Sequence, residues 1–301
     1  MMTKYTAAEI EELLTGDDKT REALFADARE ARAAHFGKGI FLYGFVYHST
    51  YCKNNCEFCY YRRDNAIERY RKSAQEVTET AERLVKSGVS LIDLTTGDDL
   101  HMYMNSYRDL VSLVTNIHAE LDTPIMVSSG VISKAAFPKL AAAGADFYAL
   151  YQETHNRKLF SRLRTAQNYD TRWGAKLLAH KAGLLIEEGI LAGVGESPAD
   201  IAVSLGEMGR IGADQMRVMS FVPQPGSPMQ QYPPGDRTRE LVIIALLRLM
   251  YPDILIPASL DVDGIAGLTA RLNAGANVVT SIIPPHSGYR GVANGELDID
   301  E

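Results

Sequence analysis

Apolar runs alternate with amphipathic segments along most of the chain. Eight runs rich in apolar or β-branched residues have the length and composition of buried strands. They cover Ile40 to Tyr47, Val89 to Thr96, Pro124 to Ser129, Ala145 to Tyr151, Ile190 to Val194, Gln215 to Val222, Ile254 to Leu260 and Ala276 to Ile283. Segments with helical periodicity separate them: Ala74 to Ser87, Tyr107 to Leu121, Ser133 to Ala143, Thr171 to Glu188, Pro198 to Ile211, Arg237 to Met250 and Asp263 to Ala274.

This alternation predicts an α/β fold with a parallel sheet, because successive parallel strands are joined by right-handed helical crossovers. Eight such units in 301 residues favour a single (β/α)8 TIM-type barrel. Several predicted helices end in a glycine suited to the left-handed conformation that follows a helix. These glycines are Gly88, Gly144, Gly189, Gly212 and Gly275.

The barrel is expected to be flanked by two smaller segments. Residues 1–36 predict an N-terminal helical cap, with amphipathic helices at Thr6 to Leu14 and Thr20 to His35. Residues 37–294 form the predicted barrel. The acidic tail, residues 295–301, is expected to be disordered because it has little apolar surface to bury.

Composition narrows the classes of partner and compartment. A net charge of −7 gives no electrostatic footprint for nucleic acid. The longest apolar run, residues 241–255, is interrupted by Arg248 and Asp253 and is too short to cross a bilayer. The N-terminus lacks the apolar core of a signal peptide. We therefore expect a cytoplasmic protein without a nucleic-acid or membrane partner.

All three cysteines of the chain lie in one short segment directly after the first predicted strand. Cys52, Cys56 and Cys59 are spaced C-x3-C-x2-C. Three thiolates in one loop suit three irons of a 4Fe-4S cluster and leave the fourth iron open to another ligand. A zinc site completed by His48 is an alternative, although structural zinc sites usually combine two separated ligand pairs. A disulfide with a leftover thiol is disfavoured by the odd cysteine count and the missing export signal.

The spacing of the three cysteines, with aromatic Phe58 before the last one, resembles the signature of radical S-adenosylmethionine (SAM) enzymes. The resemblance implies that these cysteines hold a 4Fe-4S cluster and that SAM chelates its open iron. Reductive cleavage of SAM would then give an adenosyl radical. Likeness to these enzymes and to the biotin-synthase-like group further implies SAM contacts from five residues. Two lie in the turn after the second strand, and three lie between the end of the fourth strand and the start of the next helix. The five are Gly97, Asp98, Glu153, Arg164 and Arg172.

Polar side chains interrupt the apolar strands and predict a second binding site inside the barrel. They are Asp93, Arg217, Ser259, Asp261, Thr280 and Ser281. A buried charge is costly unless it is paired or kept for a ligand. Since a guanidinium matches a carboxylate and an aspartate matches an ammonium group, Arg217 with Asp93 and Asp261 predicts a site for a zwitterionic amino acid. A permanent salt bridge between Arg217 and one of these aspartates is an equally consistent interpretation.

Residues 51–63, 257–265 and 273–281 are also similar to the lysine mutases of pyrrolysine biosynthesis, within the biotin-synthase-like group. The resemblance implies isomerisation of L-lysine to (3R)-3-methyl-D-ornithine by hydrogen abstraction, fragmentation and recombination. It assigns the six polar residues above to the amino acid and implies an electron donor such as flavodoxin or ferredoxin. The alternatives are another radical enzyme of the group, such as a hydrogenase-maturation enzyme, and a non-catalytic iron–sulfur or zinc barrel.

Overall fold

A computed structural model describes residues 5–291, apart from the side chain of Asp261. Within this range, parallel strands form one barrel wall. They are β1 (Phe41–Ser49), β2 (Leu91–Thr96), β3 (Ile125–Ser128), β4 (Phe147–Ala149), β5 (Leu185–Ala192), β6 (Gln215–Ser220), β7 (Pro257–Ser259) and β8 (Val278–Ile282).

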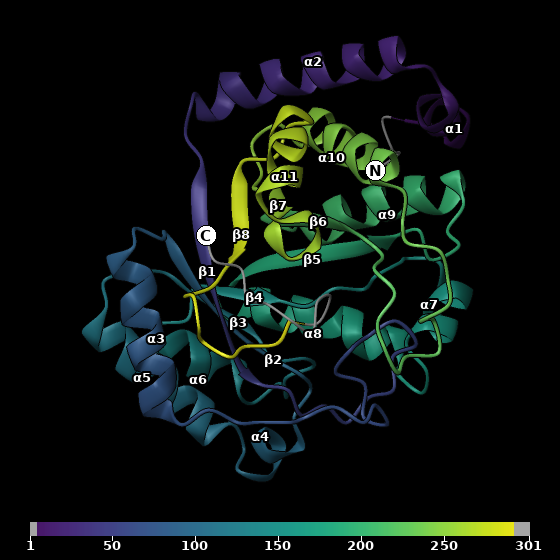
Figure 1. Ribbon diagram of the computed structural model, residues 1–301. Helices are drawn as coiled ribbons and strands as arrows, with labels where there is room; N and C mark the ends of the chain where they lie inside the picture. Colours follow the sequence, from purple (N-terminus) through teal and green to yellow (C-terminus); the bar gives the residue numbers. More distant parts are fainter. Residues whose placement is uncertain (1–4, 292–301) are drawn as a thin grey trace.

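The strand order shows how the barrel closes. The hydrogen-bonded order is β6-β5-β4-β3-β2-β1-β8-β7. A parallel bridge between Gln215 and Leu255 joins β6 to the segment before β7, and the Met216 amide donates to the Leu255 carbonyl at 3.0 Å. The predicted eight strands and the TIM-type fold are confirmed (Figure 1).

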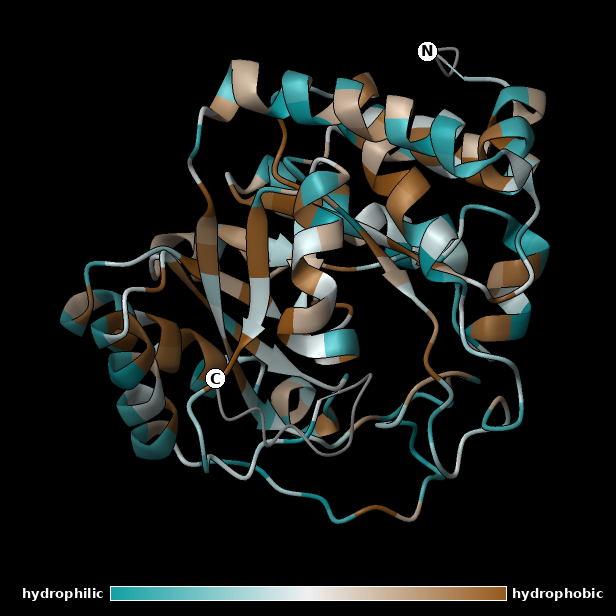
Figure 2. Ribbon diagram, turned by 45° about the horizontal axis from the view of Figure 1, so that its top comes forward, coloured by the Kyte–Doolittle hydropathy of each residue, from teal (hydrophilic) through white to brown (hydrophobic). Residues whose placement is uncertain are grey.

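Helices surround the wall and occupy most of the connections (Figure 1). They are α1 (Ala7–Thr15), α2 (Asp18–Phe36), α3 (Ala74–Lys86), α4 (Leu100–Met104), α5 (Arg108–Glu120), α6 (Phe137–Ala142), α7 (Arg157–Leu163), α8 (Tyr169–Lys181), α9 (Pro198–Ile211), α10 (Arg237–Met250) and α11 (Leu260–Asn273). Figure 2 shows that the strands are largely hydrophobic, whereas polar residues recur along the helices, as expected where one helix face covers a sheet. No helix of residues 5–291 is long and apolar enough to span a bilayer.

The two N-terminal helices pack at the end of the barrel where β1 begins, away from the cysteine loop (Figure 1). Arg32 of α2 donates to the carbonyls of Leu272 and Ala276, at 2.6 and 3.1 Å. Phe36 at the end of α2 lies edge-on to Phe41 at the start of β1. These contacts fit the predicted cap, whose domain boundary stays a prediction. The tail, residues 295–301, lies outside the described residues.

The predicted boundary between α8 and β5 is wrong. The helix ends at Lys181 instead of Glu188, and the strand begins at Leu185, so Glu187 and Glu188 are strand residues. In the sequence, Glu187 and Glu188 have the pattern expected at the polar end of a helix. In the structure, both side chains are fully buried beside cations. Gly189 is consequently inside β5 and does not end a helix. The other predicted helix-ending glycines do have positive φ.

Candidate active site

The cysteine loop leaves β1 at the carboxyl end of the barrel, where TIM-type barrels carry their active sites. Backbone hydrogen bonds tie it to the turn after β2: the Lys53 amide donates to the Asp98 carbonyl at 2.9 Å, and the Gly97 amide donates to the Ser49 carbonyl at 3.1 Å. The guanidinium of Arg69 donates to carbonyls within the loop, among them that of Arg62 at 2.6 Å. The loop is therefore held in shape by the chain itself.

The three cysteines are free and line one cavity. The predicted cofactor residues line it as well, namely Gly97, Asp98, Glu153, Arg164 and Arg172. In the part of the chain that the structure describes, no three His, Cys, Asp or Glu side chains converge on a single metal ion. His48 lines a different cavity, beside Ser49 and Arg71. His48 therefore does not line the cavity of the three cysteines, as the zinc alternative would require.

Two side chains donate hydrogen bonds to the sulfur of Cys56. Arg164 Nη1 and Gln167 Nε2 lie 3.5 and 3.0 Å from Cys56 Sγ. Donors of this kind stabilise a metal-bound thiolate. Burial raises the pKa of the Cys52 and Cys59 thiols, so metal binding has to displace their protons. Gln167 was not predicted from the sequence.

Gly97 lets the turn after β2 approach the cysteine loop. A Cβ at this position would lie 2.3 Å from the Tyr51 carbonyl oxygen and 2.9 Å from Cys52 Cβ. We expect Gly97→Ala to displace Cys52 and to lower the iron content of the reconstituted protein by at least about half, because backbone cannot move aside cheaply.

The matched control is Gly174→Ala in α8, where an added Cβ meets nothing within 4 Å. This change is expected to leave the iron content unchanged and to stabilise the helix by up to about 1 kcal/mol. Iron and sulfide assays with thermal unfolding make the comparison. Equal iron content in the two variants would contradict the role given to Gly97.

Glu153 faces the cavity from the segment after β4 and adopts a left-handed backbone, with φ of 67°. Such a conformation costs a non-glycine residue about 1–3 kcal/mol and is often kept at functional sites. Oε1 of Glu153 bonds Arg164, whereas Oε2 has no hydrogen-bond partner among residues 5–291 although it is buried. Burial raises the pKa of Glu153, against the opposing charges of Arg164 and Arg172. A free buried oxygen is suited to a ligand hydroxyl.

Arg172 and Asp98 are held by the protein itself. Arg172 Nε donates to the Tyr151 carbonyl at 2.6 Å, and burial lowers the pKa of Arg172 to about 10, assisted by the charge of Arg164. Asp98 accepts hydrogen bonds from Asn54 at 2.9 Å and from Tyr103 at 2.7 Å. Both residues lie where they were predicted, and their direct contact with SAM stays a prediction.

A second set of buried polar groups lies inside the barrel. Arg217 on β6 is 2% exposed, and its Nε bonds Glu187 Oε1 on β5 at 2.7 Å. Its Nη1 lies 3.0 Å from the Thr280 hydroxyl and 3.5 Å from that of Ser259. The Ser259 and Ser281 hydroxyls are 3.2 Å apart. Strands β6, β7 and β8 therefore bring these four predicted residues together.

Among the described side chains, the acid that pairs with Arg217 is Glu187, which was not predicted from the sequence. Tyr151 reinforces this position, because its hydroxyl donates to Glu187 Oε2 at 2.9 Å. Of the two predicted aspartates, Asp261 differs from the expectation in its secondary structure. Asp261 belongs to the first turn of α11 instead of strand β7, and its side chain lies outside the described part of the structure.

Asp93 on β2 is 1% exposed, and among the described residues neither of its carboxylate oxygens has a hydrogen-bond partner within normal distance. Burial, with the nearby charge of Glu187, raises the pKa of Asp93 to about 7. An unpaired buried carboxyl group is costly unless it serves a ligand. The interior of the barrel thus combines a guanidinium with an acid that a cationic ligand would ionise.

The interior site adjoins the cysteine cavity through Tyr151. The Tyr151 ring lines that cavity, while its hydroxyl bonds the partner of Arg217. Thr95 and Ser128 also line the cavity, and their hydroxyls lower the pKa of Asp93. A cofactor beside the cysteines and an amino acid beside Arg217 would therefore be neighbours.

Comparisons with known proteins agree with this geometry. Residues 46–206 match the family model described as the radical SAM superfamily. The chain is 45% identical over 280 residues to 3-methylornithine synthase of Methanosarcina barkeri, covering 93% of this chain and 80% of the relative. It is 30% identical over 292 residues to the hydrogenase maturase subunit HydE of Thermotoga maritima, covering 95% and 82%.

A solved structure is similar along almost the whole chain. The crystal structure of methylornithine synthase superimposes with a TM-score of 0.93 and 44% sequence identity, covering 99% of this chain and 89% of the other. The fold, the cysteine loop and the two relationships all lead to the same assignment. The chain belongs to the radical SAM superfamily and, within it, to the 3-methylornithine synthase family.

Proposed function

We propose that this protein isomerises L-lysine to (3R)-3-methyl-D-ornithine, using a 4Fe-4S cluster held by Cys52, Cys56 and Cys59. The observation that carries the proposal is the buried Arg217 inside a barrel whose mouth holds the three cysteines. When bound, the cluster and SAM supply the radical that removes a hydrogen atom from the substrate. Membership of the 3-methylornithine synthase family supports lysine as that substrate.

The proposed roles follow from charge. Arg217 binds the lysine carboxylate through its outer nitrogens, because its Nε is occupied by Glu187. Asp93 receives a lysine ammonium group. The hydroxyls of Ser259, Thr280 and Ser281 fix the orientation of the amino acid beside the guanidinium. Asp261 keeps its predicted place in this site.

The protein must also confine the reaction. Lysine and methylornithine are isomers, so the pieces formed when the lysine chain breaks have to rejoin inside the same chamber. The buried positions of Arg217, Asp93 and Thr280 exclude water from one end of it. SAM is proposed to bind at the other end of the chamber, held by Glu153, Arg164, Arg172, Gly97 and Asp98.

The proposal includes an external one-electron donor. The chain has only three cysteines, all in one loop, and so lacks the thiolates for a second cluster. A flavodoxin or a ferredoxin is the class of protein that would deliver the electron. The partner is otherwise a small amino acid.

The test is an assay of anaerobically reconstituted protein. With dithionite and SAM, L-lysine should be converted to a product of unchanged mass that mass spectrometry and chiral chromatography identify as 3-methyl-D-ornithine. Protein that cleaves SAM but leaves lysine unchanged would favour a related radical enzyme with a different amino-acid substrate. A colourless zinc protein would refute both.

The raised pKa of Asp93 predicts a pH-dependent affinity for lysine. A lysine ammonium group stabilises the ionised carboxylate, and at pH values below about 7 binding must first remove a proton. The KM for lysine should therefore fall about tenfold between about pH 6 and about pH 8. In Asp93→Asn this slope should disappear. A variant with the wild-type pH slope would remove Asp93 from the substrate site.

The same shift has a consequence for stability without substrate. The pKa of Asp93 in the folded protein lies above its ordinary value of 3.8, so Asp93 favours folding at low pH. That contribution is lost as the pH rises through about 7. Lysine should offset this loss, because it binds the ionised form of Asp93 more tightly. Its stabilisation of the protein against thermal unfolding should therefore be greater at pH 8 than at pH 6, and the change should be centred at about pH 7.

A further inference from the structure

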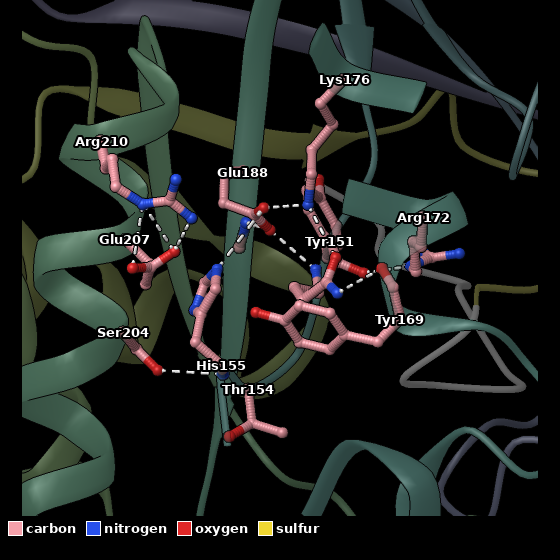
Figure 3. A network of polar contacts seen from close by, with 12 residues as sticks. Tyr151, Thr154, His155, Tyr169, Arg172, Lys176, Glu188, Ser204, Glu207 and Arg210 are labelled. Atoms are coloured by element: carbon pink, nitrogen blue, oxygen red, sulfur yellow. Dashed lines mark hydrogen bonds and ion pairs between the residues drawn. The ribbon is translucent and has the colours of Figure 1, made fainter. Parts of the chain in front are cut away.

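A buried polar cluster surrounds Glu188 of β5 (Figure 3). Glu188 lies on the outer side of the barrel wall, because neighbouring strand residues face opposite sides and Glu187 faces Arg217 inside the barrel. The cluster consists of Gln152, Lys176 and Glu188, all fully buried, with His155 beside them. Lys176 Nζ bonds Glu188 Oε2 and donates to Gln152 Oε1 at 2.9 Å. Neither the cysteine cavity nor the Arg217 site includes Glu188, Lys176 or Gln152 among the residues described above.

The second carboxylate oxygen of Glu188 accepts hydrogen bonds from the backbone beside the cavity. Glu188 Oε1 accepts the Gln152 amide at 2.7 Å and the Gly189 amide at 2.8 Å. The Gln152 side chain also reaches forward, with Nε2 donating to the Tyr169 carbonyl at 3.2 Å. A single carboxylate thus joins β5, α8 and the segment after β4.

The residue that follows Gln152 is Glu153, whose left-handed backbone directs its side chain into the cavity. Its own amide donates to the Gly189 carbonyl at 3.1 Å, and its carbonyl accepts the Leu191 amide at 2.9 Å. Glu188 therefore accepts hydrogen bonds from the backbone amides of Gln152 and Gly189, on the two sides of the backbone bond between Glu153 and Gly189. A backbone in a disfavoured conformation persists only where its surroundings fix it.

We propose that Glu188 is a positioning residue for SAM, acting through the Gln152 amide to hold Glu153 in the cavity. Lys176 has a different task, which is to neutralise Glu188. The inference rests on the proposed function, in which Glu153 contacts SAM.

Two double variants separate positioning from charge. Glu188→Gln with Lys176→Met removes both charges and keeps an amide oxygen for the two backbone amides. Glu188→Leu with Lys176→Met removes the charges and the acceptor together. Both replace an ion pair without leaving a buried charge alone, a change that proteins often tolerate.

The measurement is SAM affinity of the reconstituted holoenzyme, followed by equilibrium dialysis and by the change that SAM makes in the electron paramagnetic resonance of the reduced cluster. The Gln/Met variant should bind SAM as tightly as wild type, and the Leu/Met variant about 10- to 100-fold more weakly. Iron content and the affinity for lysine should be the same in both, since the cysteines and Arg217 are untouched.

Three results would overturn the inference or the proposal beneath it. Equal SAM affinity in the two double variants would show that the acceptor has no positioning role. Parallel losses of SAM and lysine affinity in the Leu/Met variant would show a general loosening of the barrel instead. Wild-type holoenzyme that fails to bind SAM would refute the proposed function itself.

Discussion

Replacing Arg217 by methionine is expected to abolish lysine turnover and to lower the free energy of unfolding by about 3–5 kcal/mol. The loss of stability follows because Glu187, 2.7 Å from Arg217 Nε, would be a buried carboxylate without its cation. The loss of turnover follows because the lysine carboxylate would lose its charge-assisted hydrogen bonds, each worth about 1.5–3 kcal/mol. Together these bonds correspond to at least a 100-fold loss of kcat/KM, on the order of 3 kcal/mol.

The control is the double variant Arg217→Met/Glu187→Gln. It removes both charges and keeps an acceptor for the Tyr151 hydroxyl. In the wild-type protein this hydroxyl donates to Glu187 at 2.9 Å. Denaturant unfolding should show that most of the lost stability returns, while turnover stays absent. Recovery of turnover together with stability would mean that Arg217 is only half of an interior salt bridge, as in the interpretation left open by the sequence, with Glu187 in place of an aspartate.

Replacing Cys56 by alanine is expected to eliminate iron binding and reductive cleavage of SAM, since two thiolates cannot hold three irons of a cubane cluster. Cys56 is buried, and its sulfur accepts hydrogen bonds from Arg164 and Gln167. Iron analysis, visible absorption and the yield of 5′-deoxyadenosine measure the effect.

Gln167→Leu is the matched control for the cysteine variant. It removes the 3.0 Å contact to Cys56 Sγ but no sulfur ligand. Iron should remain bound. The reduction potential of the cluster should become more negative, because one hydrogen bond to a ligating sulfur is lost. A Cys56→Ala protein that still holds the cluster and cleaves SAM would contradict the assignment of all three cysteines.

The architecture was predictable because strands buried on both faces appear as continuous apolar runs. The same rule explains the error at β5: Glu187 and Glu188 are polar residues in a buried strand, and local sequence does not reveal Arg217 and Lys176 as their partners. These pairings connect residues 30 and 12 positions apart. Periodicity alone cannot supply such tertiary contacts.

The cysteine loop was predictable for the opposite reason, because its chemistry lies within one short segment. The interior site was recognised in part: polar residues within apolar strands identified Arg217 and Asp93, whereas Glu187 and Tyr151 were overlooked. Tyr151 is at the end of an apolar run, where an aromatic residue gives no sign of a hydroxyl that bonds a buried acid. Two short helices, α4 and α7, were missed because so few residues carry little periodicity.

The neighbouring carboxylates of β5 raise the question of what keeps this strand from slipping by one residue. A slip would turn both side chains to the opposite faces and would put one of the two carboxylates in the other's place, where it would still meet a cation, so charge pairing alone is a weak safeguard. Gly189 supplies the missing discrimination. A Cβ there would lie 2.8 Å from the Tyr151 ring, and a slip in either direction would put Ile190 or Glu188 against that ring. One missing methyl group thus makes misregistered barrels sterically unacceptable.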